Sequence, residues 1–376
     1  MYGGGGSGGS GGSGGGSGSG SGAQSSSDGR SDSGGSRGEQ SALETPTSGS
    51  IRFNTDSSKL EIYNGDAWFE IDSTSPEEQT GGTRSLWAGG NTPTYFNNIQ
   101  FCNISTQGSV ADFGDLTRTG NQMNGVSSRT RGVFATGYLG SSGGVNNTID
   151  FVTIATQGNA ADFGDVSTQR AGIQPMQNST RGVLAGGQDH PSSNSQDVID
   201  FITMASTGNA LDFGDMDNTS RNGSSACSPT RGVISRGNPS TNVIQYLTIS
   251  TLGNMSDFGD ATTADTSAVG TSSNAVRGIN FTASYAPNTD DVIDFLTIAT
   301  LGNALDFGDL NHISMNGAAV CASPTRAVAG GGFDGSIQSE MDFVQIMTTG
   351  NALDFGDLEE ARSQPGAVSN GHGGLG

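Results

Sequence analysis

The chain has 376 residues, 62 of them glycine, and its 16 lysine and arginine residues against 37 aspartate and glutamate residues give a net charge of −21. Because phosphate binding needs a basic surface, this balance argues against a nucleic-acid partner. No apolar stretch reaches the roughly 20 residues that cross a bilayer, and the first residues lack the charged start and apolar core of a secretory signal. We therefore expect no membrane insertion.

Residues 1–48 form a Gly/Ser-rich segment that begins MYGGGGSGGSGGSGGG. Such a composition cannot bury enough apolar surface to offset the entropy lost on ordering. We interpret this segment as a flexible tether.

Residues 49–74 have the pattern of a small β module, with the sequence GSIRFNTDSSKLEIYNGDAWFEI over 49–71. Ile51 and Phe53 alternate with polar residues and predict a first short strand. Two further strands are expected at Leu60, Ile62, Trp68 and Phe69, around the turn residues Asn64 and Gly65. A piece this small is not stable alone, so we expect it to pack against its own copies, the rest of the chain or a larger particle.

A linker, residues 75–82, leads to a repeated region that covers residues 83–376. The phrase Asp-Phe-Gly-Asp occurs six times there, at intervals of 50, 50, 45, 49 and 48 residues. The copies begin at Asp112, Asp162, Asp212, Asp257, Asp306 and Asp354. Each copy belongs to a unit with four strand-sized pieces and no helical pattern, which is typical of the blades of a β-propeller.

Each unit has the same order of pieces. An apolar run follows an arginine and ends in glycine; the arginines are Arg84, Arg131, Arg181, Arg231, Arg277 and Arg326. An alternating strand such as residues 198–204 follows, and then a Gly-Asn pair, which predicts a two-residue hairpin turn because glycine tolerates positive φ. The Asp-Phe-Gly-Asp strand comes next. A strand of small residues, such as 222–227, precedes the following arginine and suits the crowded innermost position of a blade.

The two ends of the repeated region complement each other. The run after Arg84 has no small-residue strand before it, whereas residues 361–370 are a small-residue strand with no apolar run after them. We expect the C-terminal strand to complete the first blade, so that the ring closes without open sheet edges. The predicted fold class is an all-β, six-bladed β-propeller with four-stranded blades.

The repeated phrase itself is interpreted as structural. We expect its phenylalanines to pack between blades and one aspartate of each copy to pair with a repeat arginine or to cap a turn. The six phenylalanines are Phe113, Phe163, Phe213, Phe258, Phe307 and Phe355. Bound cations are the less favoured alternative, because Asp-x-x-Asp in a strand places its carboxylates on opposite faces. A protein kinase is excluded, since the chain has neither a lysine strand nor a His-Arg-Asp loop.

The remaining reactive side chains indicate no catalytic residue, no metal site and no cofactor. Cys102, Cys227 and Cys321 are interpreted as small buried apolar residues. His190, His312 and His372 are too scattered for a metal cluster. The charged positions mostly follow the repeat, so we expect no enzyme, with a propeller glycan hydrolase as the less favoured alternative.

Strand directions favour one face for ligand binding. In antiparallel blades, the long connections between the second and third strands emerge beside those that lead to the next blade. Variable loops on a rigid scaffold are where recognition tends to lie. The candidate glycan-binding residues in these loops are Tyr95, Phe96, Tyr138, His190, Tyr285 and Phe333.

Two family resemblances rest on these residues. The diglycine at Gly89–Gly90, the Asp-aromatic pair and the repeat arginine resemble the kelch-type β-propellers over about residues 83–376, although the blade tryptophan is missing. Residues 49–71 resemble a short module of tail-fibre and other virion proteins of bacteriophages. The Asp-Phe-Gly-Asp repeats also resemble those of structural proteins in marine phages, including cyanophages.

These resemblances imply a virion structural protein, such as a tail-fibre or decoration component, made in the host cytoplasm and carried on the extracellular particle. Its partners would be other virion proteins, bound through the tether and residues 49–74, and a host-surface glycan. Oligomerisation through the N-terminal region is also expected. The alternative is a bacterial surface or secreted propeller lectin.

Overall fold

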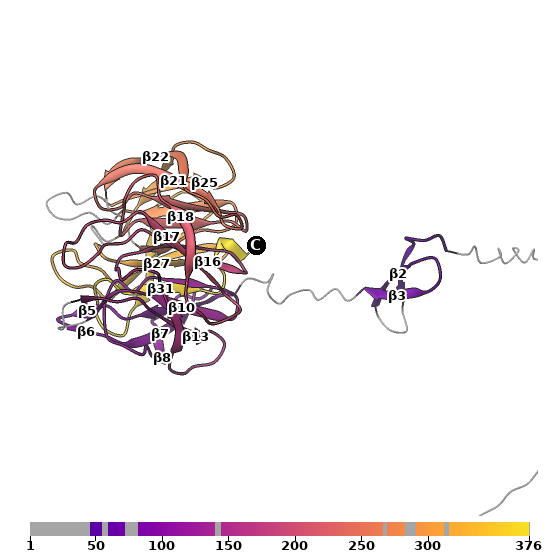
Figure 1. The fold of residues 1–376 in the computed structure, drawn as a ribbon, viewed down its shortest axis with the longest axis horizontal. Helices are drawn as coiled ribbons and strands as arrows, with labels where there is room; N and C mark the ends of the chain where they lie inside the picture. Colours follow the sequence, from indigo (N-terminus) through magenta and orange to yellow (C-terminus); the bar gives the residue numbers. More distant parts are fainter. Residues whose placement is uncertain are drawn as a thin grey trace, which may run out of the picture. The chain divides into compact units, whose positions relative to one another are not determined.

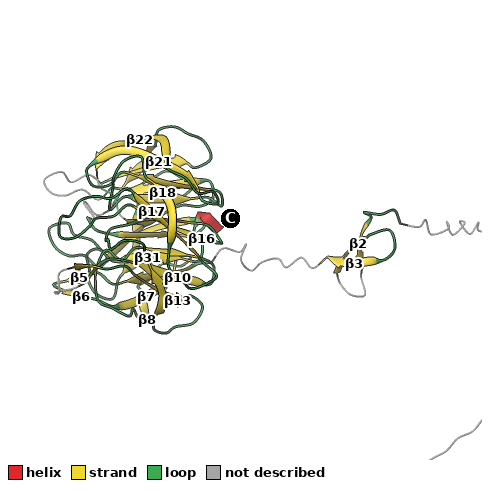
Figure 2. Ribbon diagram, in the orientation of Figure 1, coloured by secondary structure: helices red, strands yellow, loops and turns green. Residues whose placement is uncertain are grey.

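The computed structural model describes residues 46–54, 59–71, 82–139, 144–265, 269–282, 291–311 and 316–375 (Figure 1). The chain divides into two compact units, Met1–Ser73 and Thr74–Gly376. Strands make up nearly all of the regular structure in both units (Figure 2), which confirms the all-β prediction. No helix in the described part of the chain is long and apolar enough to span a membrane.

The first unit contains a three-stranded antiparallel sheet with the order β1-β2-β3. Its strands are β1 (Ile51–Asn54), β2 (Lys59–Tyr63) and β3 (Trp68–Ile71). On one face, Arg52 Nε donates to Glu61 Oε2 at 2.7 Å, and the Arg52 guanidinium lies 4.2 Å from the centre of the Trp68 ring. This cation–π contact and the ion pair close that face of the small sheet.

The second unit consists of six successive repeats, each with an antiparallel sheet. The first sheet contains β4 (Arg84–Ala88), β7 (Asn98–Asn103), β8 (Ala111–Asp115) and β31 (Gly366–Ser369). The second contains β9 (Gly125–Ser127), β10 (Arg131–Ala135), β13 (Thr148–Thr153) and β14 (Ala161–Asp165). The third contains β15 (Gln174–Gln177), β16 (Arg181–Ala185), β17 (Val198–Thr203) and β18 (Leu211–Asp215).

The other three repeats follow the same order of strands. The fourth sheet contains β19 (Ser224–Cys227), β20 (Arg231–Ser235), β21 (Thr241–Thr248) and β22 (Ser256–Asp265). The fifth contains β24 (Arg277–Phe281), β25 (Val292–Thr297) and β26 (Leu305–Asp309). The sixth contains β27 (Ala319–Ala322), β28 (Arg326–Gly330), β29 (Glu340–Gln345) and β30 (Leu353–Asp357). Two small hairpins, β5 (Asn91–Thr92) with β6 (Thr94–Tyr95) and β11 (Tyr138–Leu139) with β12 (Gly144–Val145), and the 3-10 helix η3 (Gly373–Leu375) complete the regular structure of the described residues.

The C-terminal strand completes the sheet of the first repeat, as predicted. β31 pairs antiparallel with β4, with Gly366 opposite Ala88 and Ser369 opposite Ser85. The first repeat therefore takes its inner strand from the other end of the chain.

The fifth repeat departs from the predicted four-stranded form. Its inner strand, β23 (Val269–Thr271), pairs in parallel with β19 and β27 and so joins the fourth and sixth sheets into one nine-stranded sheet. Gly270 has a φ of 134°, and a Cβ there would collide with the carbonyl oxygen of Val320. Glycine therefore permits this close sideways approach.

The Gly-Asn pairs connect neighbouring repeats, and the predicted two-residue hairpin is wrong. Residues 154–160 separate β13 from β14, so the connection is longer than a tight turn. Gly158 N donates to Phe113 O of the preceding repeat at 2.9 Å, and Asn159 Oδ1 accepts from Asp115 N at 3.1 Å. The equivalent Gly-to-Phe bonds join Gly208 to Phe163, Gly253 to Phe213, Gly302 to Phe258, Gly350 to Phe307 and, between the first and sixth repeats, Gly108 to Phe355.

The phenylalanines of the repeated phrase are buried, as predicted. Phe113 is 2% exposed and lies edge-on to Phe101, with 6.0 Å between ring centres. The guanidinium of Arg84 lies 4.7 Å from the centre of the Phe101 ring and donates through Nη1 to Ile154 O of the next repeat at 2.9 Å. The same arrangement recurs in all six repeats. An arginine lies over an aromatic ring of the third strand, and that ring is edge-on to the phenylalanine of the repeated phrase.

The predicted pairing of the Asp-Phe-Gly-Asp aspartates is wrong. Within the described residues, none of their carboxylates forms a hydrogen bond or an ion pair. Three buried carboxylates on the third strand of a repeat pair instead with an arginine of the preceding repeat. The three pairs are Arg118 with Asp150 at 2.7 Å, Arg170 with Asp200 at 2.9 Å and Arg236 with Asp294 at 2.5 Å.

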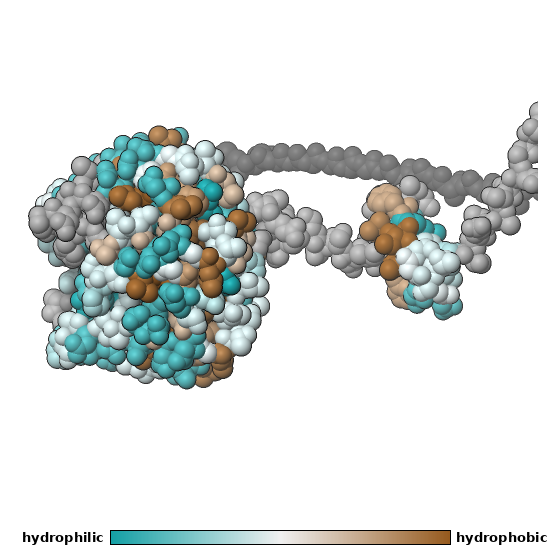
Figure 3. Space-filling model, turned by 90° about the horizontal axis from the view of Figure 1, so that it is seen from above, coloured by the Kyte–Doolittle hydropathy of each residue, from teal (hydrophilic) through white to brown (hydrophobic). Residues whose placement is uncertain are grey.

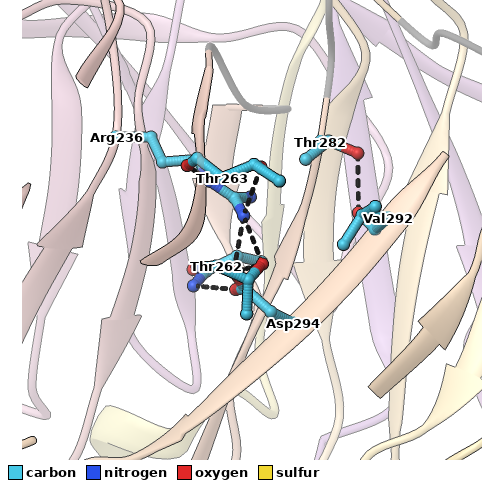
Figure 4. A network of polar contacts seen from close by, with 7 residues as sticks. Arg236, Thr262, Thr263, Thr282, Val292 and Asp294 are labelled. Atoms are coloured by element: carbon cyan, nitrogen blue, oxygen red, sulfur yellow. Dashed lines mark hydrogen bonds and ion pairs between the residues drawn. The ribbon is translucent and has the colours of Figure 1, made fainter. Parts of the chain in front are cut away.

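Asp294 shows how such a carboxylate is held (Figure 4). It accepts from Thr262 N at 3.0 Å, from Thr262 Oγ1 at 2.7 Å and from Asn280 Nδ2 at 2.7 Å, in addition to Arg236 Nη2. The carboxylate therefore accepts from strand β22 of the fourth repeat and neutralises a buried guanidinium in the same place. Buried charges of this kind are tolerated only when paired and hydrogen-bonded.

The C-terminal residues connect two repeats that are far apart in the sequence. His372 Nε2 lies 2.9 Å from Ser127 O of the second repeat, and Gly373 N donates to Ser273 O of the fifth repeat at 2.8 Å. Since a carbonyl only accepts, Nε2 carries the proton, and Nδ1 accepts from Gly374 N at 3.2 Å. The neutral imidazole is therefore fully hydrogen-bonded.

We expect His372 to make stability depend on pH. Burial lowers the pKa of His372 from 6.5 to about 4. Because the folded-state pKa is the lower one, its contribution is complete above pH 6.5 and is lost as the pH falls toward 4, by about 3 kcal/mol. Urea unfolding at pH 7, 5.5 and 4.5 should show this decrease. In a His372→Gln variant, whose amide can still donate to Ser127 O, the decrease should be smaller; equal pH profiles would contradict the assignment.

Candidate ligand-binding face

At one end of the strands, backbone bridges of the same kind recur from repeat to repeat and hold the variable loops together. Tyr138 N donates to Asn121 O at 3.0 Å, and Asn121 N donates to Tyr138 O at 3.2 Å. Equivalent bridges connect Asn91 with Ser363, Ala171 with Gln188, Arg221 with Asn238 and Asn316 with Phe333. Each joins the connection after a second strand to the segment that enters an inner strand. These two kinds of connection therefore lie together, and we call the surface they form the loop face.

Next to these bridges, five equivalent residues have a left-handed backbone. They are Gln122 (φ 55°), Gly172 (68°), Asn222 (53°), Gly317 (71°) and Gln364 (56°). Gln122 N donates to Gln364 O at 2.9 Å, and Gln364 N donates to Gly317 O at 2.7 Å, so these residues link successive repeats. Glycine is the favoured residue at such φ values, and other residues cost about 1–3 kcal/mol. Three of the five positions nevertheless carry a side-chain amide.

Further amides lie next to these left-handed residues. Asn121 Nδ2 donates to Asn91 Oδ1 at 2.9 Å and to Gln364 Oε1 at 2.6 Å, and Asn121 Oδ1 is buried without a partner. Gln188 Nε2 donates to the Tyr138 hydroxyl at 2.7 Å and lies 3.5 Å from Gln122 Oε1. Three of these amides are largely buried, with Asn121 7%, Gln122 9% and Gln188 6% exposed.

The structure brings two of the six predicted candidates together. The rings of Tyr138 and His190 meet edge-on, with 6.3 Å between their centres. Phe333 is exposed and takes the repeat position of Tyr138, whereas Tyr95 is half-buried on β6. Tyr285 lies outside the described residues.

The Phe96 side chain packs against a buried arginine. The guanidinium of the buried Arg362 lies 4.7 Å from the centre of its ring. The ion pair that Arg362 forms with Glu360 is long, at 4.0 Å, and burial lowers the pKa of Arg362 to about 10. Phe96 therefore replaces an anion as the neighbour of this cation.

Sequence reasoning missed the amides Asn121, Gln122, Gln188 and Gln364. A signal was available, because Asn121-Gln122, Arg221-Asn222 and Ser363-Gln364 stand at one repeat position, directly before an inner strand. Their equivalents Gly172 and Gly317 mark that position as one where glycine is favoured. Asparagine adopts the left-handed region readily, so Gln122 and Gln364 are the unusual residues at this position.

The loop face combines neutral amides near Tyr138 with the carboxylates of Asp189 and Asp334 in its outer loops. In the described ranges no group of three His, Cys, Asp or Glu side chains could hold a metal ion. The three cysteines are free and buried, as predicted, and burial raises the pKa of Cys227 to about 12. Amide groups beside aromatic edges match ligands rich in hydroxyl groups.

No protein-family model matches this sequence, and no curated protein matches it. The class of the protein is therefore defined by its own repeats: an all-β chain with six sheet-forming units of one design.

Proposed function

We propose that the six repeats are the blades of a six-bladed, kelch-like β-propeller. Support comes from the contacts between repeats, which return from the sixth to the first: Gly108 N donates to Phe355 O at 2.9 Å, and Arg326 Nη1 donates to Ile104 O at 3.1 Å. The pairing of β31 with β4 further supports a closed ring. A ring of this kind leaves no inner edge available for aggregation.

The protein acts as a virion structural component that contacts glycans of the host surface through the loop face. The virion role is supported by the resemblance of residues 49–71 to phage modules. The glycan role is carried by one observation, the amides of Gln122, Asn222 and Gln364 at left-handed backbone positions of the loop face, where Gln188 connects Gln122 to the Tyr138–His190 pair. A bacterial surface or secreted lectin would use the same face, so only the location of the protein separates these two functions.

Glycan contact is tested with two sets of variants in the full chain. Gln122→Gly with Asn222→Gly relieves the backbone strain, and Tyr138→Ala with His190→Ala removes the aromatic pair. We expect each pair to weaken binding by about tenfold or more. The glycine pair should leave the free energy of unfolding nearly unchanged, since the strain it relieves offsets the added freedom of the unfolded chain.

The readout is binding to an array of purified bacterial surface polysaccharides. Leu252→Ala with Met347→Ala is the matched control, because both residues are exposed in turns at the other end of the strands. Binding that survives both loop-face pairs would exclude this face, and no binding to any polysaccharide would exclude the glycan role. Mass spectrometry of purified particles would separately decide between the virion component and the free lectin.

A further inference from the structure

The small sheet of the first unit leaves one face uncovered. Its register places Ile51 opposite Ile62, Ile62 opposite Phe69 and Phe53 opposite Leu60. Residues that pair directly across antiparallel strands share a face, so these five side chains lie on one side. Their exposed fractions are Ile51 60%, Phe53 61%, Leu60 40%, Ile62 37% and Phe69 53%. Figure 3 shows the apolar surface of this unit gathered on one side.

The opposite face of the sheet is closed by its own side chains. Glu61 is 6% exposed and accepts from Arg52 Nε and from Asn54 Nδ2 at 2.9 Å. The rings of Tyr63 and Trp68 lie with 5.3 Å between their centres. Only the apolar face therefore requires a partner.

The size of the sheet indicates what that partner is. The strands span residues 51–71, and folded units below roughly 40 residues usually need disulfides, a metal or oligomerisation. All three cysteines belong to the second unit, and the described residues hold no metal-binding group. Oligomerisation is the stabilising route that remains.

We propose that the face formed by Ile51, Phe53, Leu60, Ile62 and Phe69 binds the same face of another copy of this chain. A symmetric contact requires a surface that complements itself, and these five side chains carry no charge that would repel its copy. Two such sheets can pack face to face at about 10 Å, as in a β-sandwich. The proposal does not rest on glycan contact.

The expected association is of modest strength. The exposed parts of the five side chains amount to roughly 400–500 Å² for each copy, which is large for a patch on a monomer and about half of a standard interface for each partner. We therefore expect a dissociation constant on the order of micromolar.

The test is sedimentation equilibrium of the full chain over protein concentrations from about 1 to 100 μM, which bracket the expected constant. The wild-type mass should rise from 38.0 kDa to a multiple of it. Phe53→Asp with Phe69→Asp should keep the protein at 38.0 kDa throughout. The matched control is Leu305→Asp with Leu353→Asp, which charges two leucines of the second unit that are equally exposed, at 61% and 60%, and should leave the association intact.

Two results would overturn the proposal. One is a wild-type protein that stays monomeric at every concentration. This result is also expected if the sheet binds the second unit of its own chain. The other is an association that the Phe53→Asp, Phe69→Asp variant leaves unchanged. Since these substitutions lie in the first unit, the thermal unfolding of the second unit should match wild type, and this separates lost association from general unfolding.

Discussion

Replacing Asp294 by alanine should lower the free energy of unfolding by about 3–5 kcal/mol, the largest effect we expect from a single side chain. The side chain of Arg236 is fully buried and would lose its ion pair with Asp294. Thr262 N would lose its acceptor in the same place (Figure 4). Asn280 Nδ2 would lose its acceptor as well. The cost is high because no water reaches this buried place to replace the lost ion pair and hydrogen bonds. Urea unfolding of both proteins measures the difference.

The chain itself supplies the control for this experiment. At the junction of the third and fourth repeats, Gly186 stands in place of Arg236, and Gln245 stands in place of Asp294. Gln245 Oε1 still accepts from Asp217 N at 2.8 Å, so it caps the turn without a charge.

The double variant Arg236→Gly with Asp294→Gln copies this neutral junction. It should recover most of the lost stability, because replacing both members of a buried ion pair is far less costly than removing one. If the double variant were as unstable as Asp294→Ala, shape rather than charge balance would determine the junction.

Gly164→Ala should destabilise the protein more than Gly208→Ala, although the two glycines have nearly the same backbone. Their φ values are 148° and 153°, a region that costs a residue with a side chain about 1–3 kcal/mol. A Cβ on Gly164 would lie 2.5 Å from Gly208 O of the next repeat, whereas a Cβ on Gly208 meets nothing within 4 Å. The collision should add about 1–3 kcal/mol, as overpacking does.

Urea unfolding of the two variants isolates the contact between repeats, because the backbone strain is common to both. Equal losses would mean that the strands of neighbouring repeats can move apart at little cost. A larger loss for Gly164→Ala would establish why glycine follows phenylalanine in every copy of the repeated phrase.

Much of the architecture was accessible from the sequence, because it depends on periodic local patterns. The alternation of apolar residues predicted the strands, and the missing inner strand at Arg84 predicted the pairing with β31. The burial of Phe113 and its equivalents also followed from the repeat. In each case the period of the pattern determines which side chains point inward, whatever the distant partner is.

Tertiary structure alone decided the features whose partners lie in another repeat. The Gly158-Asn159 pair looks like a local turn in sequence, yet its partners are Phe113 and Asp115 of the preceding repeat. Likewise, the sequence predicted that aspartates of the repeated phrase pair with arginine. In the structure, arginines pair instead with Asp294 and its equivalents Asp150 and Asp200, which are buried.

The candidate site shows the same division. Sequence reasoning placed the variable loops on one face and selected Tyr138 and His190, which do meet. It did not identify Gln122 or Gln364 as candidates, because their left-handed backbone and their hydrogen bonds to other repeats are visible only in the structure. A sequence pattern records which side chains leave water, but which groups then meet is determined by contacts between residues far apart in the chain.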